Sequence, residues 1–133
     1  MAEHVIFLIG GEDEESGMLT SSDASDRCSL SFSFRGRSVE ASASDFFEAF
    51  CQIRLQLEAE ALIPFCYGAS LNVYPSGMSR QMSNGMSAYR LVHGTQATKN
   101  SLVHIFEQGH DVIPASVANQ LAFFKAWVAS LGA

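Results

Sequence analysis

The spacing of hydrophobic and polar residues predicts several strands in the first third of the chain. A run of five apolar residues ended by two glycines indicates a buried strand over 4–9. Over 28–34, apolar residues alternate with serines, which is the period of a strand with one buried and one solvated face. After a turn at Gly36, residues 38–41 can return as the second strand of a hairpin.

A first amphipathic helix is predicted over about 44–61, with Ser42 or Ser44 as its cap. Its apolar stripe consists of Phe46, Phe50, Ile53 and Leu57. Burying four such side chains contributes roughly 6 to 12 kcal/mol before entropy is subtracted. We therefore expect this helix to be a main element of the core.

A second amphipathic helix is predicted over about 115–131, beginning after Ser116 and ending at Gly132. Its apolar positions recur every three or four residues, at Val117, Leu121, Phe124, Val128 and Leu131. Such a stripe predicts a face that packs on the core.

Shorter strand-like pieces lie between the two helices, at 65–67, 70–74, 87–93 and 102–106. Strands and helices are mixed without regular alternation, which favours an α+β fold with a mainly antiparallel sheet. A length of 133 residues fits a single domain over 1–133. Only 17% of residues are charged, against about 25% in a typical soluble domain, so apolar surface is left for a partner to cover.

Acidic residues are concentrated near the N-terminus, and they narrow the choice of partner. Half of the 14 acidic residues precede residue 27, and the densest run is Glu12, Asp13, Glu14 and Glu15. We expect residues 11–27 to form a long flexible loop. Its charge repels nucleic acid and anionic membranes but suits a basic protein. The alternative interpretation is a solvated loop without a partner.

The stretch NVYPSGMSRQMSNGM over 72–86 predicts a short helical connector bounded by turn residues. Met78 and Met82 stack on one face of a helix over 76–84. Methionine suits either an irregular core gap or an adaptable recognition surface. Core filling is the commoner use, so we expect both methionines to be buried. Arg80 then points away from them, towards an acid of this chain or of a partner.

Catalytic and metal-binding patterns are missing from the sequence. Cys28, Cys51 and Cys66 are odd in number and share no ligand spacing, which predicts buried free thiols. A cysteine hydrolase would need a thiolate beside His93 or His104, and neither Cys51 on an apolar stripe nor Cys66 in a strand suits that role. The histidines and Asp111 share no metal-ligand spacing, so no metal or other cofactor is expected.

The longest apolar run is far shorter than the roughly 20 residues of a membrane span, and no signal peptide is recognisable. A cytoplasmic location is therefore expected.

Four blocks in the second half resemble a group of small bacterial proteins, the immunity-type proteins of polymorphic toxin systems. The blocks are Asn72 to Met78, Ala88 to Leu91, Leu102 to Phe106, and Pro114 through Trp127. They are packing and turn signals, so no functional residue is carried over. The resemblance implies a bacterial, non-enzymatic binding protein.

Three hypotheses follow. The first is a non-enzymatic protein-binding module, in the narrower form an immunity-like protein that covers the active site of a basic toxin. Its candidate contact residues are Glu12, Asp13, Glu14, Glu15, Met78, Arg80 and Met82. The alternative is a small-molecule-binding protein or enzyme with an apolar pocket between sheet and helices, lined by Phe, Met, Tyr67 and Tyr89. The third is a self-complementary homodimer.

Overall fold

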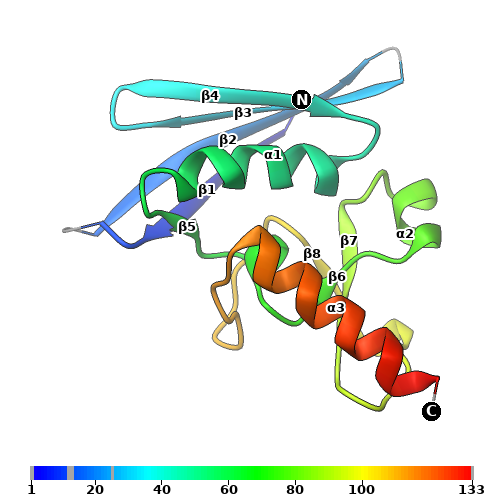
Figure 1. Ribbon diagram of the computed structural model, residues 1–133. Helices are drawn as coiled ribbons and strands as arrows, with labels where there is room; N and C mark the ends of the chain where they lie inside the picture. Colours follow the sequence, from blue (N-terminus) through cyan, green and yellow to red (C-terminus); the bar gives the residue numbers. More distant parts are fainter. Residues whose placement is uncertain (1, 12–13, 25, 133) are drawn as a thin grey trace.

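The strands of the first half pair into an antiparallel sheet in the order β4-β3-β2-β1-β5 (Figure 1). These strands are β1 (Ala2–Ile9), β2 (Glu15–Ala24), β3 (Arg27–Phe34), β4 (Arg37–Ala43) and β5 (Ile63–Pro64). The computed structural model describes residues 2–11, 14–24 and 26–132. The strands predicted over 4–9, 28–34 and 38–41 are confirmed as β1, β3 and β4.

α1 (Phe46–Glu58) packs across one face of this sheet and forms the main core with it (Figure 1). The most deeply buried side chains of this core include Phe32, Phe47, Phe50, Ile53 and Leu57. Phe47 and Phe50 also contact the second half of the chain, at Tyr74 and Phe106. The expected cap at Ser42 or Ser44 is wrong, because Asp45 accepts the Glu48 N–H at 2.8 Å. Ser42 instead belongs to β4, where its hydroxyl bonds that of Ser29 at 2.7 Å.

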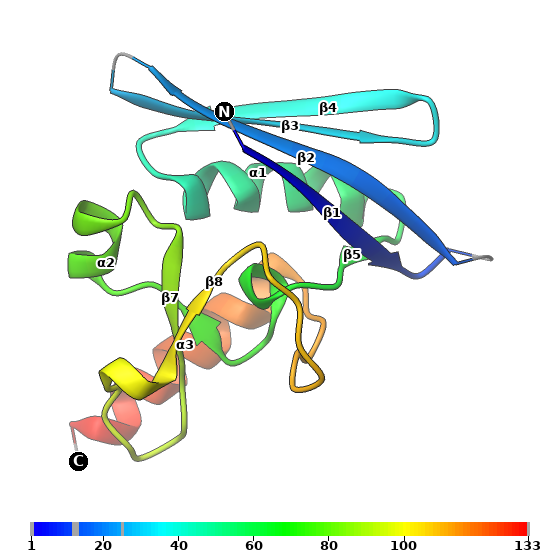
Figure 2. The same ribbon diagram turned by 180° about the vertical axis from the view of Figure 1, so that it is seen from behind.

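The second half forms a smaller antiparallel sheet in the order β6-β7-β8, with two further helices beside it (Figure 2). Its elements are β6 (Val73–Tyr74), α2 (Gly77–Met82), β7 (Ser87–Arg90), β8 (Leu102–His104) and α3 (Val117–Leu131). Two short 3-10 helices span Tyr67–Ala69 and Lys99–Ser101. The four strands predicted in this half are thus shorter or displaced, because turns and 3-10 helices interrupt them. The α+β class and the single domain are confirmed.

The prediction of a loop over 11–27 is wrong for residues 15–24, which form β2 in the interior of the sheet. β2 pairs with β1 on one side and with β3 on the other. Of its inward positions, Leu19 is a large apolar residue, but Gly17 and Ser21 on either side are small, which weakens the sequence signal. A Cβ on Gly17 would lie 2.3 Å from the Phe32 ring, so glycine there makes room for the core. Tertiary pairing therefore overrides a weak local propensity.

The apolar face predicted for the second helix is only partly covered: Val117, Phe124 and Leu131 are half-buried. Within α3 the buried residue is Gln120, while Leu121 and Val128 are exposed. Ser116 caps the helix by accepting the Asn119 N–H at 3.1 Å, and Gly132 is its C-cap, as expected. Val117 packs against the core and Phe124 stacks on Tyr74, and the one fully buried side chain, Gln120, adds polar contacts that fix α3 in place.

A buried polar cluster joins α3 to α1. Arg54 donates to the side-chain oxygen of Gln120 at 2.7 Å and to the carbonyl oxygens of Gly68 and Ala115 at 3.0 Å. Gln120 in turn donates to three backbone carbonyl oxygens, those of Gly68, Ser70 and Val73. Burial lowers the pKa of the Arg54 guanidinium. This cluster ties α1, α3 and the 68–73 segment together.

Candidate functional site

α2 is a six-residue helix that is strongly fixed at its start. Ser76 and Ser79 form a reciprocal capping box, in which each side chain accepts the backbone N–H of the other, at 3.0 and 2.8 Å. Ser83 extends the arrangement by donating to the Ser79 carbonyl oxygen at 2.6 Å. A short helix would otherwise be marginal in water, so these caps explain why it forms here.

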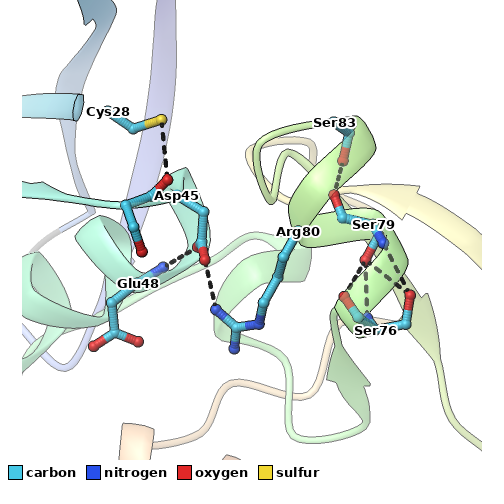
Figure 3. A network of polar contacts seen from close by, with 8 residues as sticks. Cys28, Asp45, Glu48, Ser76, Ser79, Arg80 and Ser83 are labelled. Atoms are coloured by element: carbon cyan, nitrogen blue, oxygen red, sulfur yellow. Dashed lines mark hydrogen bonds and ion pairs between the residues drawn. The ribbon is translucent and has the colours of Figure 1, made fainter. Parts of the chain in front are cut away.

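Arg80 anchors this helix to the N-terminus of α1 (Figure 3). Its guanidinium donates to Asp45 Oδ2 at 2.9 Å, while Asp45 Oδ1 caps α1. The same guanidinium lies over the rings of Phe47 and Tyr74, at 5.3 and 5.7 Å from their centroids. The expectation that Arg80 would face an acid of this chain or of a partner is thus fulfilled within the chain.

The turn after α2 also packs against α1. Phe46 donates its N–H to the Asn84 carbonyl oxygen at 2.7 Å. Gly85 has a φ of +77°, and a Cβ there would lie 2.8 Å from Asp45 Oδ1 and 3.0 Å from the Phe47 nitrogen. Only glycine allows this approach at low cost. Arg80 within α2 and the turn that follows the helix therefore both fix it against the start of α1.

Met78 and Met82 do not fill the core, and the prediction that they are buried is wrong. Met78 is 67% and Met82 81% exposed. The reason is that Arg80 takes the inward side of the helix, where it meets Asp45 and two aromatic rings. Met86 lies beyond the helix and packs against the core instead. Two flexible apolar side chains thus project from a rigidly held helix.

An aromatic groove of about 300 Å³ begins where α2 starts. Its walls are Tyr74, Pro75, Ser76, Tyr89, Leu91, Gln96, Ala97, Phe124, Trp127 and Leu131. Tyr74 and Phe124 stack with their ring centroids 4.2 Å apart. Trp127 donates to the carbonyl oxygens of Val92 and Thr95, at 3.0 and 2.9 Å, and so fixes the loop that closes one side.

This groove was not predicted as a site from the sequence. Tyr89 was among the residues expected to line a pocket, but Tyr67 lies elsewhere and donates to Asp111 Oδ1 at 2.6 Å. Arg90 donates to the other oxygen of the same carboxylate, and these hydrogen bonds lower the pKa of Asp111. The only sequence signal for the groove was the pair Phe124 and Trp127, three residues apart on α3.

Glu14 and Glu15, the acidic candidates within the described residues, lie far from the methionines. Glu12 and Asp13 are outside the described residues, and Glu14 is exposed. Glu15 begins β2 and pairs with Arg35, whose hydrogen bond lowers the pKa of that carboxyl. The β1–β2 end of the sheet and α2 lie on opposite sides of the molecule in both views (Figures 1 and 2). The two groups of candidates thus form separate surfaces.

The cysteines are buried free thiols, as predicted. Burial raises the pKa of Cys51 to about 11 and that of Cys66 to about 12. His104 lies beside His4, with ring centroids 5.5 Å apart, and His93 is exposed. Among the described residues, no group of three His, Cys, Asp or Glu side chains could hold a metal ion.

Comparison with known proteins finds no matching family model and no matching curated protein. The resemblance to immunity-type proteins therefore stays a prediction. Within the described ranges, none of the helices has both the length and the apolar character needed to cross a membrane.

Proposed function

We propose that this chain is a non-enzymatic protein-binding module whose contact surface is the methionine helix α2 with the adjoining aromatic groove. The observation that carries this proposal is the exposure of Met78 and Met82 on a helix anchored by Arg80. An anchored helix keeps its shape on binding, so little ordering entropy is lost there. Methionine side chains then adapt to the apolar side chains of the partner.

The aromatic groove supports the same proposal, because aromatic residues are enriched among those that contribute most to protein binding. Tyr74 belongs to the groove wall and also contacts Arg80, so the groove and α2 share one supporting network. Arg80 is a positioning residue here, since its guanidinium contacts groups of its own chain.

The narrower form of the proposal is an immunity-like protein that covers the active site of a cognate toxin. The resemblance in the second half of the chain and the formal net charge of −6 favour it. A negative binder attracts a basic target such as a nuclease and speeds their encounter.

The test is calorimetric titration of the whole protein with the products of adjacent genes. The double substitution Met78→Ser and Met82→Ser should weaken the interaction about ten- to a hundredfold. Gln81→Ser, an exposed change on the same helix, serves as the matched control and should leave affinity unchanged. If the folded protein binds none of these products, or if the double variant binds like the original, the proposal is wrong.

The second candidate function is small-molecule binding in the same groove, which its volume of about 300 Å³ and its aromatic walls favour. A ligand found by mass spectrometry after native purification, and lost in Trp127→Ala, would support it over protein binding.

A further inference from the structure

The face of the five-stranded sheet opposite α1 has no described helix or strand over it (Figures 1 and 2). On this face β1 presents Val5, Phe7 and Ile9, which are 59%, 43% and 44% exposed. Met18 of β2 lies directly across from Val5 and is also exposed. These four residues form the apolar strip.

The apolar strip conflicts with the pattern of β1 itself. A continuous apolar run is typical of a strand that is buried on both faces. The inward half of the run, Ile6 and Leu8, is buried against the core, whereas the outward half is left uncovered by the described chain. Exposed apolar patches with polar borders mark interaction sites.

The rest of the face is polar and hollowed. The cross-strand row that begins with Val5 and Met18 continues with Ser33 of β3 and Ser38 of β4. A shallow hollow of about 580 Å³ lies over this region, with Val5 and Met18 in its wall. Arg35 and Arg37 also line it, and their charges are paired with Glu15 and Glu60. A partner can therefore enter beside the apolar strip.

Carboxylates border the same face. Glu3, Thr20, Ser31 and Glu40 form the neighbouring row across the four strands, which places Glu3 and Glu40 at its two ends. Both are exposed, and within the described residues neither takes part in an ion pair. Glu14, also exposed, immediately precedes β2.

The part of the chain that forms the large sheet and α1 also carries a net negative charge. Residues 1–60 hold twelve acidic and four basic residues, a net charge of −8, and residues 61–133 hold two acidic and four basic residues, a net charge of +2. Of the four basic residues in the first part, Arg54 is buried, and Arg35 and Arg37 pair with carboxylates. Arg27, at the outward-facing start of β3, donates to the Ser42 carbonyl oxygen at 2.9 Å. The exposed carboxylates on or beside this face, Glu3, Glu14 and Glu40, outnumber it. The field over this face is thus negative.

We infer that the outer face of the sheet is a second docking surface, for a partner protein with an apolar centre bordered by Lys or Arg. A second copy of this chain does not fit, because it would bring the same carboxylates together. The inference goes beyond the proposed function, since it concerns a different surface and does not depend on the methionine helix.

The test uses a pair of synthetic amphipathic helical peptides, one with Leu and Lys faces and one with Glu in place of every Lys. The whole protein, with its methionine methyl groups labelled, is titrated with each peptide by NMR. The Lys peptide should shift the Met18 signal, and the Glu peptide should not. Phe7→Thr should weaken binding of the Lys peptide about tenfold, while the control Gln81→Ser should leave it unchanged.

Threonine suits a strand, so the variant should keep its fold, and Val5→Thr is a second variant on the same strip. The inference is overturned if neither peptide binds, if both bind equally, or if Phe7→Thr has no effect. It is also overturned if light scattering shows a dimer that Phe7→Thr dissociates, because a second copy then covers the strip. Failure of the Met78 and Met82 variants in calorimetry would refute only the proposed function.

Discussion

The two long helices have similar apolar stripes but are held in different ways. α1 buries eight residues, most of them apolar, whereas the buried residue of α3 is Gln120. α1 meets a sheet with a row of inward apolar side chains, while α3 meets the short β6 strand and the 68–73 segment, whose carbonyl oxygens need donors. An apolar stripe thus predicts a helix reliably, but what the helix packs against depends on the rest of the fold.

The largest effect on stability should come from truncating a buried side chain of α1. Leu57→Ala removes a fully buried side chain and should lower the free energy of unfolding by about 2 to 5 kcal/mol, because it leaves a cavity. Val128→Ala on the exposed stripe of α3 should change it by less than about 0.5 kcal/mol. Urea denaturation of both variants measures the difference. Equal losses would mean that α3 is packed as tightly as α1.

Removal of the polar link between the helices should rank next. Arg54→Met leaves Gln120 and the carbonyl oxygen of Ala115 without their donor, which should destabilise the protein by about 2 to 4 kcal/mol. The matched control is Arg37→Met, which removes an exposed ion pair with Glu60 and should cost about 0 to 1 kcal/mol. Denaturant midpoints give both values. A cost for Arg54→Met no greater than that of the control would refute the idea that this cluster holds α3.

Elements with a strong local pattern could be predicted from the sequence, and elements that depend on distant contacts could not. α1, β1, β3 and β4 were predicted because strong periodic patterns coincide with good local propensity. β2 was missed because Gly17 and Ser21 occupy two of its inward positions and leave Leu19 as the one large apolar residue between them. The pairing with β1 and β3 makes a strand favourable there. The local spacing of residues carries no information about such pairing.

The candidate site was predicted less well than the fold. The methionine helix was located, but its buried side was assigned to the methionines and not to Arg80. That choice depends on Asp45, which is 35 residues away in sequence. The aromatic groove brings together Tyr74, Tyr89 and Trp127 from separate elements, so local spacing could indicate only its α3 wall.

The smallest effect concerns pH at the contact between the two sheets. Burial, and to a lesser extent His4, lower the pKa of His104 below 6.5, with Glu107 opposing. The Phe106 N–H donates to His104 Nδ1 at 3.2 Å, which requires that nitrogen to be unprotonated. The folded state thus binds fewer protons than the unfolded state, and stability should fall as the pH drops through 6.5 towards the lowered pKa.

The loss should be below about 1 kcal/mol, because the imidazole is only half-buried. Thermal unfolding between pH 7.5 and 5 of the original protein, His104→Gln and His93→Gln checks it. His104→Gln should flatten the dependence, and His93→Gln serves as the matched control at an exposed position. An unchanged slope in His104→Gln would show that another group titrates.

The most direct test of the central claim is methionine oxidation by hydrogen peroxide, followed residue by residue by mass spectrometry. In the free protein Met78 and Met82 should oxidise faster than Met86, which packs on the core. In the complex with whichever adjacent gene product binds in calorimetry, both should become protected while Met18 keeps its rate. If Met78 and Met82 oxidise as fast in the complex as in the free protein, the methionine helix is not the contact surface.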